Sequence, residues 1–268
     1  MKSFKLLPAI MALPFLSFAQ TSLTDAEPKI PDQALTRVLV IPFHPTRYYF
    51  SDCDKDLSHG SNMSRENLRY SFQASMDYAS EQWLEKSMQP VNLFQLKDSV
   101  SKMMMEQFHD RVGYAYDSPT RINMKGKKNP LSKMREQMEN DSKGGGGKAS
   151  NNEDEDCYTT LEPEDGQYMK LIFHDREFLD ELTALYEPDY IVTINQFEIV
   201  TDYEKCIDRE HGKFRRRIKV HYNVYRPDGK LMHGDVITAK YNSATNNFNK
   251  MVQDNFGVLA EYIAASMP

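Results

Sequence analysis

The stretch Val38-Leu39-Val40-Ile41-Pro42-Phe43 decides the fold, because it is a continuous apolar run rich in β-branched residues. Such a run is typical of a strand that is buried on both faces of a sheet. Pro42 has no N–H to donate to a neighbouring strand, so it is expected at the end of the strand. We therefore predict that this strand lies inside a sheet and not at its edge.

The residues that precede this strand predict export. Residues 1–19 combine a short positive region, an apolar core over residues 6–16 and small side chains just before the cleavage position, as secretory signal peptides do. The core is too short to cross a bilayer as a helix, which argues against the alternative of a retained membrane anchor. We expect cleavage before Gln20, a periplasmic or secreted protein, and a disordered lead-in over residues 20–35.

The composition narrows the possible partners. Removal of residues 1–19 leaves 31 basic and 39 acidic residues, a net charge of −8. This balance and the predicted export argue against nucleic acid as a partner. No later stretch approaches a membrane-spanning length of apolar residues, so no membrane span is expected. A mature chain of about 250 residues is long enough for one large domain or two small ones.

Residues 36–123 are predicted to form the first half of an α/β domain. The assignments rest on apolar residues that recur every three or four positions in helices and on short apolar runs in strands. The expected elements are a polar loop over residues 51–63, a helix capped by Ser64 and ending near Lys86, a strand over residues 91–96 and a helix over residues 98–112.

Composition changes sharply over residues 124–167. This segment contains four consecutive glycines at 144–147, an acidic run at 153–156 and scarcely any large apolar residues. Such a segment cannot bury enough apolar surface to offset the entropy lost on ordering. We predict a disordered insertion between the two halves of the domain.

Residues 168–268 are predicted to form the second half. Asp175 can cap a helix that stops before Pro188, and Pro227-Asp228-Gly229 is a turn between two apolar runs. The remaining expected elements are a strand over residues 190–200, a hairpin of residues 218–225 and 231–239, and a C-terminal helix with Phe248, Val252, Phe256, Leu259 and Ile263 on one face. The whole indicates an α/β fold: one mixed sheet of about five strands, with helices packed mainly on one face.

The basic cluster at residues 213–219 is the candidate binding site. In a strand, Arg215, Arg217, Lys219 and His221 would share one face, whereas Arg216 would share the other with apolar residues. Such a stripe is suited to an anionic glycan, a lipid phosphate or an acidic protein surface. The alternative is that these cations pair with acids on neighbouring strands, namely Glu198, Asp202, Glu204 and Asp235.

The alternating aspartates Asp52, Asp54 and Asp56 suggest two further hypotheses. Such a series opens calcium-binding loops, but the EF-hand pattern needs Gly where Leu57 stands and Glu where Met63 stands. The same carboxylates, close to three consecutive aromatic residues at 48–50, are the best local candidates for the catalytic pair of a hydrolase. Aromatic residues that cover the end of the core are the more ordinary explanation for residues 48–50.

Other chemistry-bearing residues form no known motif. Cys53, Cys157 and Cys206 show no metal-ligand spacing; Cys157 and Cys206 are the easiest pair to join in an oxidising compartment, and three unpaired thiols are the alternative. The seven histidines are scattered, and no nucleotide-binding or nucleophile motif occurs. We therefore expect no cofactor, no resident metal and no catalytic site.

The order of elements resembles a family of small periplasmic α/β domains. The resemblance lies in RVLVIPF at 37–43, YIVTINQFEI at 190–199 and IKVHYNVYRPDGKLMHGDVI at 218–237. The family includes the curli-secretion lipoprotein, the penicillin-binding-protein activator lipoprotein and the N-terminal domain of the Tol-system propeller protein. This chain lacks their lipid-anchoring cysteine, carries a long insertion, and has Met232-His233 where the hairpin usually has an aromatic residue.

The resemblance implies a non-catalytic module that binds other envelope proteins. With the predicted signal peptide, this favours an exported binding or assembly protein of the bacterial cell envelope, with an envelope protein or an anionic glycan as its partner. The alternative function is an exported hydrolase that acts on an envelope polymer through a carboxylate pair assembled from distant segments.

Overall fold

The computed structural model describes residues 35–119, 161–163, 166–208, 213–242 and 246–268. Its main sheet is mixed and has seven strands in the order β3-β1-β7-β8-β9-β5, with β2 also paired to β7. Strands β1, β2, β3 and β7 run parallel, and β7, β8, β9 and β5 are antiparallel neighbours. The strands are β1 (Arg37–Ile41), β2 (Tyr49–Ser51), β3 (Gln89–Asn92), β5 (Leu161–Pro163), β7 (Tyr190–Asp208), β8 (Lys213–Tyr225) and β9 (Leu231–Asn242).

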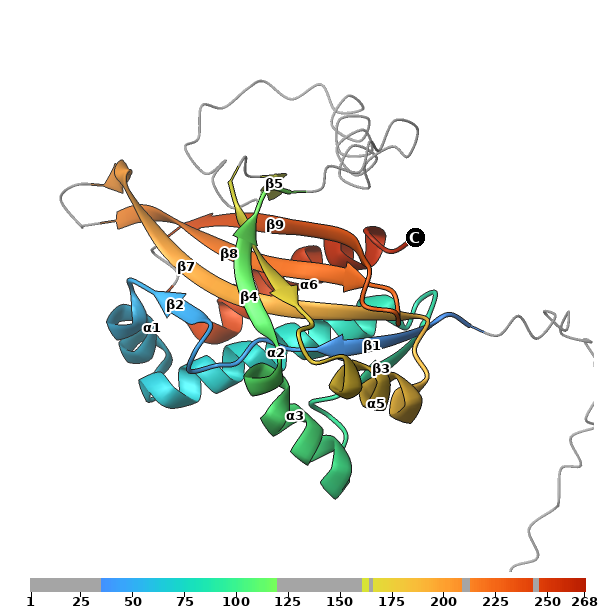
Figure 1. Ribbon diagram of the computed structural model, residues 1–268. Coiled ribbons are helices and arrows are strands. Elements are labelled where there is room, and N and C mark those ends of the chain that lie inside the picture. Colours follow the sequence, from blue (N-terminus) through green and yellow to red (C-terminus); the bar gives the residue numbers. More distant parts are fainter. Residues whose placement is uncertain (1–34, 120–160, 164–165, 209–212, 243–245) are drawn as a thin grey trace, which may run out of the picture. The chain divides into compact units, whose positions relative to one another are not determined.

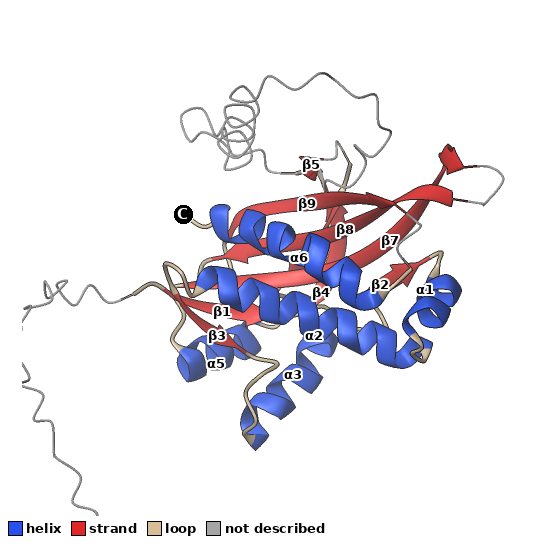
Figure 2. Ribbon diagram, turned by 180° about the vertical axis from the view of Figure 1, so that it is seen from behind, coloured by secondary structure: helices blue, strands red, loops and turns tan. Residues whose placement is uncertain are grey.

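Helices cover both faces of this sheet, and the two longest share one face. Helices α2 (Arg65–Leu84) and α6 (Phe248–Ala265) lie side by side across it, with α1 (Asp54–Ser61) next to them (Figure 2). The other face carries α3 (Ser99–Arg111), α5 (Arg176–Tyr186) and a two-stranded ribbon of β4 (Gly113–Asp117) and β6 (Tyr168–Ile172) (Figure 1). The predicted α/β class is confirmed: β2 and β5 have three residues each, which leaves five longer strands in the sheet.

Strand β1 lies inside the sheet, as its sequence predicts. It pairs with β3 on one side and β7 on the other. Val38 and Val40 face the cluster formed with α2 and α6, whereas Leu39 and Ile41 face the cluster formed with α3 and α5. All four side chains are fully buried, because a strand between two apolar layers has no solvent-facing side. Pro42 follows the last paired residue.

The predicted caps and turn are also present. The Ser64 side chain accepts a hydrogen bond from the Asn67 N–H at 3.1 Å, and Asp175 does the same for Phe178 at 2.9 Å. Each cap satisfies a backbone donor that the first turn of a helix leaves without an intrahelical partner. Gly229 has a φ of 76° in the turn between β8 and β9, a backbone conformation that favours glycine.

Some elements differ from the predictions. The polar segment after β2 is helix α1 and not a loop; it has a single buried apolar residue, Leu57, too little to give a helical pattern. Strand β3 starts two residues before the predicted strand, and Val100 is exposed although it fits the apolar stripe of α3. Strand β5 lies within the segment predicted to be disordered. The predicted signal peptide, residues 20–34 of the predicted lead-in, and residues 124–160 and 164–165 of the predicted insertion lie outside the described residues.

Strand β6 is joined to the main sheet by buried side chains. His221 Nδ1 accepts a hydrogen bond from the Met169 N–H at 2.9 Å, and Asn223 Oδ1 accepts one from the Leu171 N–H at 2.8 Å. Asn195 Nδ2 donates to the Met169 carbonyl at 2.8 Å. These side chains satisfy the edge of β6 that does not pair with β4, which would otherwise be buried without partners.

Gly234 provides the space into which the first side chain of β6 packs. A Cβ atom at this position would lie 2.4 Å from the ring of Tyr168, which is fully buried. We expect Gly234→Ala to lower the free energy of unfolding by about 1–3 kcal/mol, because an overfilled core must shift to relieve the clash. Urea denaturation measures the effect. Gly166→Ala is the matched control, since no described atom lies within 4 Å of the added Cβ. Equal stability of the two variants would contradict the packing argument.

Candidate binding face of the main sheet

The candidate site lies on the face of β8 that also carries the ribbon. Tyr225, Asn223 and His221 alternate along this face and hydrogen-bond the backbone of β6. Because side chains two residues apart share a face of a strand, the same row continues as Lys219, Arg217 and Arg215. The predicted stripe is therefore a real row on one strand face, with polar anchors at one end and cations at the other.

His221 does not belong to the cationic part of this row, contrary to the prediction that it would line the stripe. Only 3% of its surface is exposed. Its Nδ1 accepts a hydrogen bond from Met169, so in the neutral ring the proton is on Nε2, which lies 3.4 Å from Glu198 Oε1. The cationic stripe is therefore defined as Arg215, Arg217 and Lys219.

The register places two acids beside the stripe. Asp202 of β7 lies opposite Arg215, and Glu198 lies opposite Lys219. Burial acts to raise the pKa of Glu198, but the nearby His221 and Lys219 outweigh it, so the pKa is lowered. Two of the acids predicted as partners of the cations, Asp202 and Glu198, therefore lie beside the stripe on the neighbouring strand. The candidate partner Asp235 lies opposite Tyr222 and so belongs to the other face.

A further pair of facing residues differs from these two, because both of its members are cations. Lys240 of β9 lies directly opposite Arg217. Arg215 is exposed, whereas Arg217, Lys219 and Lys240 are half-buried. Arg217 and Lys240 therefore place two positive charges directly opposite each other on this face of the sheet.

Arg216 lies on the opposite face, as its position in the strand predicts. It is 5% exposed, and its guanidinium donates to Asp56 Oδ2 at 2.7 Å, to Asn246 Oδ1 and to Thr201 Oγ1 at 3.3 Å. The partners come from α1, from β7 and from the residues just before α6. Arg216 therefore ties three distant segments together and is not part of the stripe.

The three aspartates of the D-x-D-x-D series bind different partners. Asp52 accepts hydrogen bonds from the Thr201 N–H and hydroxyl, both at 2.8 Å. Asp54 accepts from the Tyr49 hydroxyl at 2.7 Å and from Arg69 at 3.1 Å, and Asp56 pairs with Arg216. The series therefore connects β2 and α1 to the rest of the fold. This arrangement supports neither the calcium loop nor the carboxylate pair of the hydrolase hypothesis.

The neighbouring aromatic residues separate into three environments. Tyr49 is buried and stacks on Phe197 at 5.9 Å between ring centroids. Tyr48 packs against Tyr114 of β4 at 4.4 Å, and Phe50 is exposed on β2. Only Phe50 is placed to meet a partner; the other two rings close the end of the core.

The cysteines can be placed only in part. Cys53 is buried with a free thiol beside Ser51, and burial raises its pKa. Cys157 and the side chain of Cys206 lie outside the described residues, so the predicted pairing stays a prediction.

Comparisons with protein families, curated proteins and solved structures found no match. The resemblance to periplasmic α/β domains therefore stays a prediction, and the functional argument depends on the geometry of the stripe. Among the described helices, none has the length and apolar character needed to cross a membrane.

Proposed function

We propose that this chain is an exported, non-catalytic binding or assembly protein of the bacterial cell envelope. It recognises an envelope protein or an anionic glycan through Arg215, Arg217 and Lys219. The observation that carries the proposal is the facing pair of Arg217 and Lys240, which concentrates positive charge on one half of the sheet face. The signal-peptide pattern of residues 1–19 supports the location, and the family resemblance supports the non-catalytic role.

The geometry of the stripe suits an extended anion. Side chains two residues apart along a strand are spaced by about 7 Å, so the three cations cover about 13 Å. They project from a sheet that is fixed on its other face by α2 and α6. A rigid row of this kind can meet successive acidic groups of a polymer or an acidic protein strip without losing backbone entropy on binding.

Replacing Arg215, Arg217 and Lys219 together with serine tests this proposal. We expect association with cross-linked envelope fractions to fall at least tenfold and the thermal midpoint to change little, because surface charges contribute little to folding. Binding of the wild-type protein should also weaken as salt rises, since screening acts over about 8–10 Å at physiological ionic strength. Pull-down from the fractions, and titration with polygalacturonate as a defined polyanion, measure both effects.

The matched control replaces three exposed cations elsewhere, Lys55, Arg65 and Lys102, with serine. It makes the same change in net charge and should bind as the wild-type protein does. Wild-type binding by the stripe variant at every salt concentration would contradict the proposal. Recovery of the wild-type protein alone, with no enriched partner and no polygalacturonate binding, would do so as well.

A further inference from the structure

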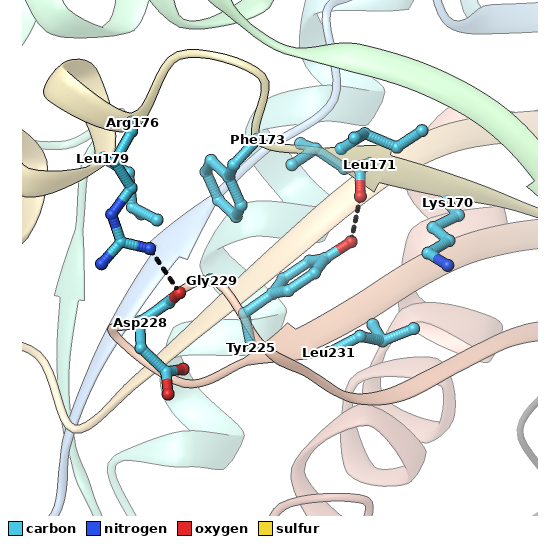
Figure 3. A pocket seen from close by; sticks show the side chains of 10 residues that line it. Lys170, Leu171, Phe173, Arg176, Leu179, Tyr225, Asp228, Gly229 and Leu231 are labelled. Atoms are coloured by element: carbon cyan, nitrogen blue, oxygen red, sulfur yellow. Dashed lines mark hydrogen bonds between the residues drawn. The ribbon is translucent and has the colours of Figure 1, made fainter.

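A pocket of about 290 Å³ lies at the opposite end of β8 from Arg215 (Figure 3). It is formed by the end of β6, the first turn of α5 and the turn that joins β8 to β9. Its walls are mainly apolar and include Phe173, Tyr225 and Leu231. No sequence motif indicated this site, because its lining residues come from two distant stretches of the chain, residues 170–179 and 225–231.

The walls of the pocket are held in place by the surrounding structure. The Tyr225 hydroxyl donates to the Leu171 carbonyl and lies 2.9 Å from Asn223 Oδ1, and only 2% of Tyr225 is exposed. The Phe173 ring meets Tyr225 edge-to-face, with centroids 5.2 Å apart. A Cβ at Gly229 would lie 2.8 Å from Leu179, so the glycine leaves room at the turn. The pocket is thus preformed, as ligand sites usually are.

Two cations stand at different ends of the pocket. Arg176, the first residue of α5, donates to the Asp228 carbonyl at 2.8 Å, and its Nε lies 3.1 Å from Asp180. These contacts use two of the five N–H donors of a guanidinium. Lys170 of β6 pairs with Asp117 at 2.9 Å on the other side. Both acidic partners are well exposed, so solvent screens their charges.

The pocket also has an acidic residue at its rim. The Asp228 carboxylate accepts a hydrogen bond from the Lys230 N–H at 3.0 Å, which fixes it in the turn. Its backbone carbonyl, by contrast, orients Arg176. Among the described lining residues, the charged side chains are therefore Lys170, Arg176 and Asp228. The Asp228 carboxylate already accepts a hydrogen bond from the backbone of its turn.

We propose that this pocket binds a small organic carboxylate with an apolar body. The carboxylate would pair with Arg176, whose planar guanidinium can donate two parallel hydrogen bonds. The apolar body would pack against Phe173, Tyr225 and Leu231. The volume is at the lower limit for ligand pockets, which restricts the ligand to a molecule smaller than a typical drug.

The test is a titration of ¹⁵N-labelled protein with 3-phenylpropionate and with hexanoate, each compared with its neutral amide. We expect saturable shifts of the backbone amides of Phe173, Gly229 and Leu231, and at least fivefold weaker binding of the amides. No saturable shift at these residues with either carboxylate would overturn the proposal. Equal affinity for a carboxylate and its amide would also overturn it.

Variants of Arg176 test whether this cation binds the carboxylate. Arg176→Met should weaken carboxylate binding at least fivefold, to the level of the amide, and leave the affinity for the amide unchanged. Arg226→Gln is the control, because Arg226 is exposed in the same turn but does not line the pocket. If Arg176→Met does not fold, Arg176→Gln, which keeps a polar side chain, removes the same charge and is tested with the same two ligands. Unchanged carboxylate affinity in the variant that is measured would overturn the proposal.

This proposal does not depend on the proposed function, because the stripe and the pocket lie at opposite ends of β8. The serine variant of the stripe should bind 3-phenylpropionate as the wild-type protein does. The failure of one proposal therefore leaves the other intact.

Discussion

Replacing Asp77 with asparagine is expected to raise the free energy of unfolding by about 5 kcal/mol at pH 8.5 and to change it little below pH 4. Asp77 lies on the buried side of α2 and is fully buried. Neither of its carboxylate oxygens accepts a hydrogen bond of regular geometry from a described residue. A buried carboxylate without such partners is costly to ionise.

The pKa of Asp77 determines the sign of this effect. Burial raises it from 3.8 to about 8; the nearby Asn92 amide opposes the rise, and the charge of Glu81 adds to it. Between pH 3.8 and about pH 8, Asp77 is protonated in the folded protein but ionised in the unfolded chain. Stability therefore falls as pH rises through this window, by about 1.4 kcal/mol for each unit between the two pKa values. Asparagine cannot ionise, so the variant avoids this loss.

Urea denaturation of both proteins from pH 4 to pH 9 measures the difference. The wild-type curve should decline toward alkaline pH more steeply than the Asp77→Asn curve. Glu106→Gln, an exposed carboxylate on α3, is the control and should follow the wild-type protein. Parallel curves for the wild-type protein and Asp77→Asn would show that Asp77 is ionised at little cost.

The second large effect is expected at Arg216. Arg216→Met should lower the free energy of unfolding by about 2–4 kcal/mol, because three hydrogen bonds that join distant segments are lost. Asp56→Asn should cost about 1–3 kcal/mol, because it leaves the buried guanidinium without its charged partner. The smaller effect is expected for Asp56, since its side chain is 54% exposed and water replaces part of the lost contact.

A double-mutant cycle separates the ion pair from the other contacts of Arg216. The loss of stability in the double variant should be smaller, by at least about 1 kcal/mol, than the sum of the losses in the two single variants. Lys55→Met, an exposed neighbour of Asp56 on α1, should stay within about 0.5 kcal/mol of the wild-type protein. Additive single effects would indicate that the two side chains contribute independently.

The elements that sequence patterns predicted correctly are those with local signals. The run at β1 is apolar on both faces, and the helices after Ser64 and Asp175 begin with side chains that cap their own backbone. The turn at Gly229 requires a residue that tolerates positive φ. Each signal depends on residues close in the chain, so no knowledge of the tertiary contacts is needed to recognise it.

The features that were missed depend on distant partners. Helix α1 has one buried apolar side chain. Its Asp56 pairs with Arg216, and Asp52 just before the helix binds Thr201; both partners lie far along the chain. The ribbon of β4 and β6 follows from side chains of β7 and β8 that bind the backbone of β6. Alternation along β8 separated Arg216 from the stripe correctly, but the burial of His221 beneath the ribbon could not be predicted from β8 alone.

The parallel pairing of β1 has a consequence for how the chain folds during synthesis. Val38 pairs with Tyr190, more than half the chain length away, so the central pairing of the sheet has a high contact order. As the chain emerges from the ribosome, the apolar run of β1 is complete long before β7 exists, and only the short strand β3 can pair with it earlier. An unpaired apolar strand of this kind is prone to aggregate. A fragment that ends before β7 should therefore depend on chaperones to stay in solution, whereas the full chain protects the same residues within its interior.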